Sequence, residues 1–191
     1  MQNFANGAYK TQSKRIFMTK TAVFLSNGTE EIEAVTAIDV LRRGGATCHI
    51  VSIDEETVVG SHGIAIKADK LIGDFDVTEY DALIIPGGLK GAQNISQNLY
   101  AVAAIKQAAA NGKVVAAICA APALVLAKHG LLNGKKATCY PAEDFVKLLS
   151  AAQYKTDSVV TDGNIITADG PLSAMEFALA VCDALKLNPS F

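Results

Sequence analysis

Cys119 is the residue whose type and surroundings best suit covalent chemistry. It lies between the apolar run 114–118 and the Ala-rich segment 120–127, which predicts a sharp turn from a buried strand into a helix. The first N–H groups of a helix carry partial positive charge, so we expect a lowered pKa and a nucleophilic thiolate at Cys119. Pro122 fits the first helical turn. The alternative is an inert cysteine in an Ala-rich core.

Three carboxylates, those of Glu30, Glu31 and Glu33, open the first predicted helix and could exchange protons with this thiol. We expect Ile32 to face the core, so that the three acids point in different directions and one enters the crevice toward Cys119. Burial there would raise the pKa of that carboxyl group. Acidic residues also serve as helix-dipole partners, and residue types alone do not choose among the three. Their charge disfavours a nucleotide phosphate at this helix start.

The turn Pro86-Gly87-Gly88 follows another predicted strand and lets the backbone approach a ligand closely. One of its N–H groups, together with the N–H of Ala120, could form an oxyanion hole. The alternative is an ordinary tight turn between a strand and a helix.

The histidines supply no obvious partner for the cysteine. His129 lies ten residues beyond Cys119, about 15 Å away along a helix. His49 falls inside a predicted strand, and His62 falls at a hairpin tip, where it is either exposed or able to enter a site, including that of a neighbouring subunit. No histidine or CxxC pair has metal-ligand spacing, so we expect neither a metal site nor a disulfide framework.

Composition favours one domain over residues 20–191 of this 191-residue, half-hydrophobic chain. The net charge of -2 and the lack of a long basic run argue against a nucleic-acid partner, and no apolar stretch is long enough to span a bilayer. The four separated cysteines favour a reducing compartment, the cytoplasm. Residues 1–19 lack acidic side chains, which indicates an added expression segment, an organellar leader or a native arm, with Met18 a candidate native start.

Strands alternate with helices along the chain, which predicts an α/β fold with a parallel sheet covered by helices on both faces. Residues 57–68, around Gly60-Ser61-His62-Gly63, indicate an inserted β-hairpin. The carboxyl ends of the parallel strands should bring the loops at residues 26–33, 86–91 and 119 to one crevice. The predicted strands are 21–25, 47–53, 82–85, 114–118, 137–139, 158–160 and 164–167, and the predicted helices are 32–43, 99–110, 120–127, 143–149 and 172–185.

Four segments in this order resemble the PfpI/ThiJ superfamily, in the branch of the parkinsonism-associated protein deglycase and its bacterial relatives. The segments are Gly28-Thr29-Glu30-Glu31-Ile32-Glu33-Ala34-Val35, Pro86-Gly87-Gly88-Leu89-Lys90-Gly91-Ala92-Gln93-Asn94, Ala116-Ala117-Ile118-Cys119-Ala120-Ala121-Pro122, and Asp169-Gly170-Pro171 with Glu176-Phe177-Ala178-Leu179-Ala180. The resemblance implies a flavodoxin-like three-layer sandwich, a homodimer and no cofactor.

The resemblance also implies roles for individual residues. Cys119 is similar to the family's oxidisable nucleophile and Glu33 to its protonated glutamate, with Gly88 and Ala120 supplying backbone N–H groups. Where some relatives have a histidine before a proline, this chain has Tyr140, a poor base at neutral pH, which leaves most proton transfer to Glu33.

A further departure disfavours peptidase activity, since the protease branch places a histidine where this chain has Ala120. His62 falls where relatives carry a polar hairpin residue, so Tyr140 and His62 are candidate accessory residues. The implied function is a cysteine-dependent enzyme of α-oxoaldehydes such as methylglyoxal, or of their early adducts on amino and thiol groups. The rival is a sensor of oxidative stress, or a chaperone, acting through oxidation of Cys119, with Cys139 a candidate resolving thiol.

Overall fold

The computed structural model describes residues 18–191, and its centre is a seven-stranded sheet. The strand order is β10-β11-β7-β6-β1-β2-β5, and every pairing is parallel except that of β10 with β11. The strands of this sheet are β1 (Lys20–Leu25), β2 (Thr47–Ser52), β5 (Lys70–Leu71), β6 (Ala82–Ile85), β7 (Val114–Ile118), β10 (Val159–Asp162) and β11 (Ile165–Ala168). The predicted mostly parallel sheet is confirmed.

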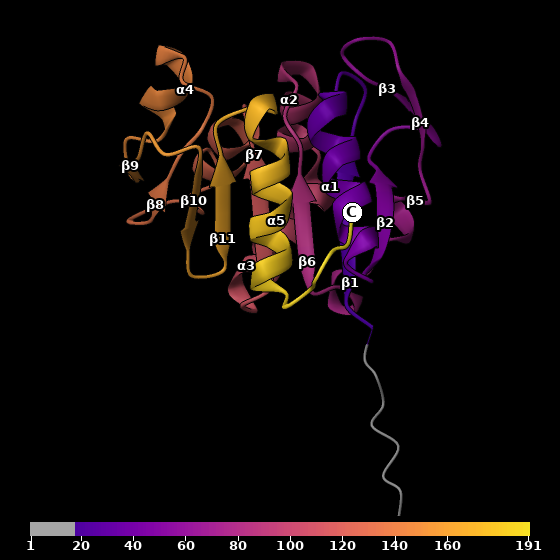
Figure 1. Cartoon of the computed structure of the whole chain (residues 1–191). Coiled ribbons are helices and arrows are strands. Elements are labelled where there is room, and N and C mark those ends of the chain that lie inside the picture. The colour runs from indigo at the N-terminus through magenta and orange to yellow at the C-terminus, as the bar shows by residue number, and fades with distance from the viewer. Residues whose placement is uncertain (1–17) are drawn as a thin grey trace, which may run out of the picture.

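Helices cover both faces of the sheet, as Figure 1 shows with α1 and α5 in front and α3 behind. They are α1 (Glu31–Arg43), α2 (Leu89–Gln97), α3 (Leu99–Ala110), α4 (Glu143–Leu148) and α5 (Ala174–Ala184). The central strands β1 and β6 are almost wholly buried, because each has one apolar core above it and another below. Aliphatic burial on both faces therefore fixes the sheet that carries the loops at its carboxyl edge.

The predicted hairpin is present as β3 (Thr57–Val59) and β4 (Ala65–Lys67), paired antiparallel outside the main sheet. Its tip bonds to the loop after β1: Gly28 N–H donates to Val59 O and Ser61 N–H donates to Thr29 O, both at 2.8 Å. The insertion is therefore anchored beside the start of α1 rather than free of the domain. A second small sheet pairs β8 (Lys136–Ala137) with β9 (Gln153–Tyr154).

Several predicted elements have different bounds. Helix α2 was not predicted, because it is short and contains Gly91, Asn94 and Ser96, which lower its helix propensity. The helix expected at 120–127 is a short π-helical segment, Pro122–Ala127, and the last helix begins at Ala174 after a 3₁₀ turn, Pro171–Ser173. The strand expected to end at residue 160 continues to Asp162.

Most of the predicted N-terminal extension, residues 1–17, lies outside the described residues. Within residues 18–191, no helix combines the length and the hydrophobicity needed to cross a membrane. All four cysteines belong to this part of the chain, and each is a free thiol.

Candidate active site

Cys119 occupies a strained turn directly after β7. Its φ of 64° lies in the left-handed region, which is costly for a residue with a Cβ. Two backbone hydrogen bonds hold it there: Cys119 N–H donates to Ala168 O at 2.9 Å, and Cys119 O accepts from Tyr140 N–H at 2.8 Å. The surrounding strands thus impose the conformation and leave the side chain half-buried at the carboxyl edge of the sheet.

Glu33 is the acid that meets the thiol. It lies in the first turn of α1 with no exposed surface, and its Oε2 accepts a 2.6 Å hydrogen bond from Gly87 N–H. Its carboxyl group lies beside the Cys119 thiol, since a Cβ on Gly87 would come within 2.8 Å of Glu33 Oε2 and 3.1 Å of Cys119 Sγ. Burial raises the pKa of Glu33 to about 7, helped by the charge of Glu30 and opposed by the interactions with Gly87 and Cys119. Among the described residues, Oε1 of Glu33 is buried without a hydrogen-bond partner. This carboxyl group can therefore hold or release a proton near neutral pH.

The expected low pKa of Cys119 is wrong. Burial first, and then the charge and hydrogen bonding of Glu33, together raise the pKa of this thiol to about 12, although the N–H groups of Ala120 and Gly88 act to lower it. The short π-helical segment that follows gives too little dipole to offset desolvation and a neighbouring carboxylate. At neutral pH the pair is a thiol beside a half-ionised carboxyl group, not a resting thiolate.

Gly88 and Ala120 direct their N–H groups toward the sulfur from two different loops. Gly88 precedes α2 with a φ of 80°, and a Cβ on it would collide with Gly28 O and Glu30 N. Only glycine fits this close approach of the two loops. The geometry gives two backbone donors, a thiol and a carboxyl group around one position. The Gly-Gly turn in the sequence indicated that Gly87 has a free N–H group. It did not indicate that this N–H group donates to Glu33.

The expected orientation of Ile32 is also wrong: its side chain is 57% exposed, whereas Glu31 and Glu33 are buried. The hairpin tip supplies the reason. Glu31 accepts hydrogen bonds from His62 N–H at 2.6 Å, His62 Nδ1 at 2.8 Å and Ser61 Oγ at 3.1 Å. Burial alone would raise the pKa of Glu31, but these bonds lower it to about 2. The helix start is therefore turned so that one acid serves the thiol and another clamps the hairpin.

His62 lies at the exposed hairpin tip, where the hydrogen bond and the charge of Glu31 raise its pKa. Its ring nitrogen Nδ1 is also 3.9 Å from Glu30 Oε1. His62, Glu30 and Glu31 each place one ligand-type atom within 4.8 Å of the others, a grouping that their separation in sequence did not indicate. The Glu31 oxygens are already hydrogen-bonded to the hairpin tip, so the cluster functions as an internal clamp.

The other histidines lie where they cannot serve Cys119. His129 Nε2 contacts Ser96 Oγ at 3.2 Å, and half-buried His49 is 2.8 Å from the hydroxyl of Tyr80. Tyr140 borders the site through its backbone bond to Cys119, and Cys139 is buried with its thiol bonded to Tyr140 O at 3.4 Å. Burial raises the pKa of Cys139 to about 11.

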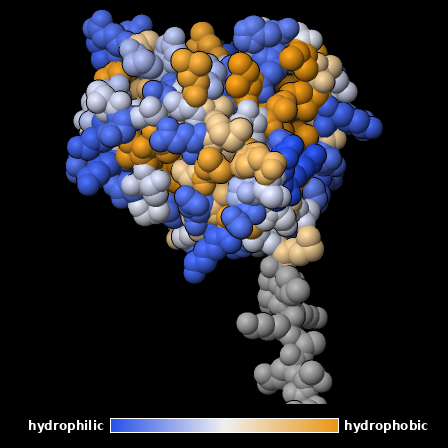
Figure 2. Space-filling view, viewed as in Figure 1, coloured by the Kyte–Doolittle hydropathy of each residue, from blue (hydrophilic) through white to orange (hydrophobic). Residues whose placement is uncertain are grey.

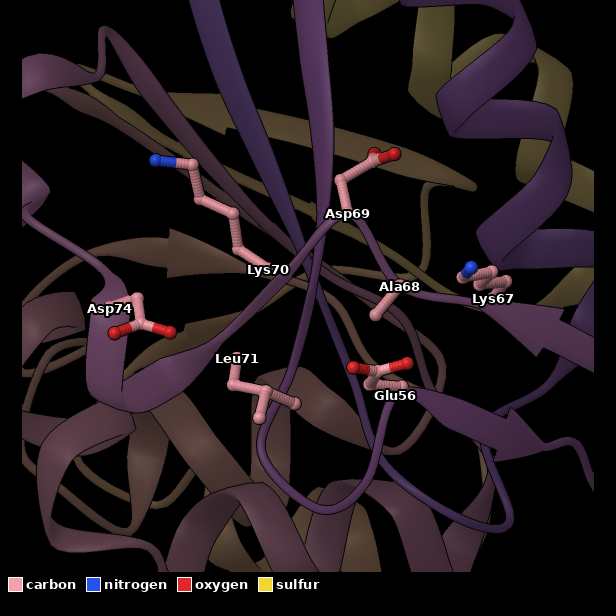
Figure 3. Close-up of a pocket in the computed structure, with 7 residues that line it drawn as sticks. All are labelled: Glu56, Lys67, Ala68, Asp69, Lys70, Leu71 and Asp74. Atoms are coloured by element: carbon pink, nitrogen blue, oxygen red, sulfur yellow. The ribbon is translucent and has the colours of Figure 1, made fainter.

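Two surface hollows of the described residues differ in chemistry. The larger, about 330 Å³, lies at the β5 edge of the sheet and shares no residue with the Cys119 cluster. Figure 3 shows the Lys70 and Asp69 side chains pointing away from one another above Leu71 and Glu56. The smaller, about 300 Å³, is lined by Tyr140, Pro141, Asp169, Gly170, Pro171 and Leu172, two segments that both bond to the Cys119 turn.

The sequence is similar to a known family over most of its length. Residues 19–184 match the model of the DJ-1/PfpI family. The chain is 40% identical over 168 residues to protein DJ-1 homolog B of Arabidopsis thaliana, covering 87% of this chain and 38% of that protein. It thus spans about two fifths of that relative's length. It is 36% identical to the Parkinson disease protein 7 homolog of Danio rerio, covering 87% of this chain and 89% of that protein.

The solved structure of oxidized DJ-1 from Toxoplasma gondii has the same fold. It superimposes with a TM-score of 0.83 and 43% sequence identity, over 87% of this chain and 90% of that one. This likeness confirms the predicted flavodoxin-like sandwich.

Proposed function

The chain belongs to the DJ-1/PfpI family, and from that premise we propose that it is a cysteine-dependent enzyme of α-oxoaldehydes such as methylglyoxal, free or as early adducts on amino and thiol groups. One observation carries the proposal: the Cys119 thiol and the buried Glu33 carboxyl group lie against the same side of Gly87, and the pKa of that carboxyl group is raised to about 7. A base poised near the working pH beside a nucleophile is the arrangement that proton-coupled addition to a carbonyl requires.

The first step is addition of sulfur to the aldehyde carbon. Because the Cys119 pKa is raised, the thiol attacks while the Glu33 carboxylate takes its proton. A carbon–sulfur bond forms, and the π electrons of the aldehyde move to its oxygen. The N–H groups of Gly88 and Ala120 would stabilise the developing negative charge. Protonation of that oxygen by Glu33 gives a neutral thiohemiacetal.

The second step is an internal redox exchange within the substrate. The Glu33 carboxylate removes the proton from the former aldehyde carbon to give an enediolate, whose negative charge lies on the oxygen of the neighbouring carbon. The hydroxyl proton passes from the first oxygen to the second, and Glu33 returns the proton that it took to the neighbouring carbon. The product is a thioester of the 2-hydroxy acid. Water cleaves this thioester, releases lactate from methylglyoxal and returns the Cys119 thiol, so the scheme needs no cofactor.

A second candidate function, redox sensing or a chaperone role governed by oxidation, is favoured by one observation. Half-buried Cys119 faces two N–H donors and the Glu33 carboxyl group, which when protonated would hydrogen-bond a sulfinate as the N–H groups would. The similar Toxoplasma gondii structure is of an oxidized protein. Cys139 as a resolving thiol has less support, because its raised pKa disfavours the thiolate.

We propose that the protein is a homodimer acting in a reducing compartment, the cytoplasm. Exposed apolar side chains lie on α1, in the hairpin and at the start of α5, namely Ile32, Val35, Ile64 and Met175. Figure 2 shows hydrophobic residues in the upper part of the face that carries α1 and the hairpin. A second copy of this surface would cover them. Free thiols at all four cysteines suit the reducing compartment.

The test is lactate formation from methylglyoxal by the reduced protein, together with mass spectrometry after a low dose of peroxide. Cys119→Ser should abolish turnover and Glu33→Gln should reduce it at least a hundredfold, since general acid–base catalysis contributes about 10²–10⁴. Cys182→Ala, which changes a buried thiol on α5, is the control and should retain activity. Full turnover by Cys119→Ser would overturn the mechanism. No turnover with rapid stoichiometric oxidation of Cys119 would favour the sensor.

A further inference from the structure

We propose that the hollow between Tyr140 and Leu172 is a specificity subsite that receives an uncharged apolar substituent, preferably an aryl ring, on the carbonyl carbon of the α-oxoaldehyde. The inference rests on the proposed function and adds to it the class of substrate. Its six lining residues, Tyr140, Pro141, Asp169, Gly170, Pro171 and Leu172, come from the segments after β8 and after β11.

The hollow adjoins the nucleophile through the backbone. One wall begins at Tyr140, whose N–H donates to Cys119 O, and the other follows Ala168, whose O accepts from Cys119 N–H. The two walls meet where the Tyr140 ring lies about 3.6 Å from the position that a Cβ on Gly170 would occupy. A substrate held by its aldehyde at Cys119 therefore has this hollow beside it for its remaining group.

The lining chemistry selects the substituent. An aromatic ring, two proline rings and a leucine form most of the walls, and Leu172 is fully exposed, so an apolar group placed there would remove it from water. The hollow of about 300 Å³ has the size of a small-ligand site.

Asp169 is the charged residue of the hollow. Its Oδ1 accepts the Ser173 hydroxyl, which fixes the carboxylate at the rim. A negative charge at this position repels an anionic substituent. Phenylglyoxal should therefore be preferred to methylglyoxal, and glyoxylate, whose substituent is a carboxylate, should be disfavoured.

Gly170 offers a way to fill the hollow without straining the fold. Its φ of 168° is extended backbone open to any residue, and an added Cβ meets only the Tyr140 ring at ordinary contact distance. Gly170→Val should lower kcat/KM for phenylglyoxal about tenfold or more while changing that for methylglyoxal little, the range expected for an apolar subsite. Gly73→Val is the matched control, because nothing lies within 4 Å of its added Cβ.

A second pair of variants tests the walls. Leu172→Ala should lower the phenylglyoxal-to-methylglyoxal ratio of kcat/KM. Leu99→Ala, which truncates another exposed leucine, at the start of α3, should leave that ratio unchanged. Tyr140→Phe should retain the ratio and Tyr140→Ala should lose it, because the ring rather than the hydroxyl group forms the wall. A ratio that no variant at 140, 170 or 172 alters would overturn the subsite while leaving the proposed function intact.

Binding without turnover separates the two proposals. In the Cys119→Ala background, acetophenone, which has the aryl group and no aldehyde, should receive NMR saturation transfer from the protein. Adding Gly170→Val should abolish the transfer, and adding Gly73→Val should not. Saturation transfer to acetophenone that persists in the Gly170→Val variant would overturn the subsite, whether or not the protein turns over any aldehyde. If the protein does not turn over methylglyoxal, the proposed function is overturned, whatever the binding result.

Discussion

The N–H of Gly87 donates a 2.6 Å hydrogen bond to Oε2 of Glu33, and the space where a Gly87 side chain would lie is filled by Glu33 and Cys119. A Cβ on Gly87 would come within 2.8 Å of that oxygen and 2.7 Å of the Cys119 Cβ. Glycine here supplies a donor and also leaves room for the thiol and the carboxyl group to meet. Three loops from three strands therefore close on one point.

Gly87→Ala should lower kcat/KM for methylglyoxal at least tenfold, because a displacement of about 1 Å at a reacting pair can cost a hundredfold. Gly73→Ala, which has open space around its Cβ, should retain the wild-type value. Steady-state kinetics with thermal melts of both variants make the comparison. Unchanged kinetics in Gly87→Ala would mean that the pair tolerates displacement.

Glu33→Gln should change how stability depends on pH. The folded-state pKa of Glu33 is about 7, above its ordinary value of 4.5, so the stability that the neutral carboxyl group contributes is present below pH 4.5 and is lost as pH rises through 7. Glutamine does not titrate. The free energy of unfolding of the variant minus that of the wild type should therefore increase by up to ~3 kcal/mol between pH 4.5 and 7.5.

Urea unfolding at three pH values measures this difference. Glu176→Gln is the control, since Glu176 lies in the first turn of α5 but is exposed. A difference for Glu33→Gln that stays constant with pH would show that Glu33 does not titrate in this range.

The same substitution should lower the pKa of Cys119. Burial raises this pKa first, and the charge and the hydrogen bond of Glu33 raise it further, so removing the carboxylate leaves only burial against the Gly88 and Ala120 donors. Thiolate absorbance at 240 nm, followed against pH with Cys119→Ser subtracted, reports it. A Cys119 pKa that is unchanged or higher in Glu33→Gln would contradict the coupling.

Glu31→Gln should lower the pKa of His62, because the Glu31 hydrogen bond and charge are its main causes of elevation. NMR titration of the imidazole protons measures both histidines at once. His49, whose lowered pKa arises from burial and the charge of Lys70, should keep its value and is the internal reference. Equal titration of His62 in both proteins would refute the clamp at the hairpin tip.

Replacing Cys119 should separate backbone strain from chemistry. In the left-handed region a Cβ costs about 1–2 kcal/mol, so Cys119→Gly should be at least as stable as Cys119→Ala. In an ordinary helix the same replacement of alanine by glycine should destabilise the protein: Ala109→Gly in α3 should lower the free energy of unfolding by about 0.5–1 kcal/mol. Denaturant unfolding of the three variants and the wild type measures these differences in stability. A Cys119→Gly variant less stable than Cys119→Ala would argue against backbone strain at residue 119.

The sequence by itself determined the sheet, the order of its segments and the convergence of the site loops. Apolar runs long enough for buried strands alternate with helical patterns, which predicts a parallel sheet. The loops at Glu33, Gly87 and Cys119 follow strands of this sheet and so meet at its carboxyl edge. These are local patterns combined with one rule of topology. Helix α2 escaped prediction because it has only nine residues and Gly91 interrupts its first turns, although its buried face packs against the core.

The resemblance pointed to Glu33, but only the tertiary structure gives the physical reason why this acid meets the thiol and how the pair is charged. Glu30, Glu31 and Glu33 are equivalent as residue types, and the choice depends on the hairpin some thirty residues away, whose N–H groups take Glu31 and leave Ile32 outside. The pKa of Cys119 was mispredicted for the same reason. A helix terminus is visible in sequence, but burial and a neighbouring carboxylate arise from long-range packing, and here they outweigh the local dipole.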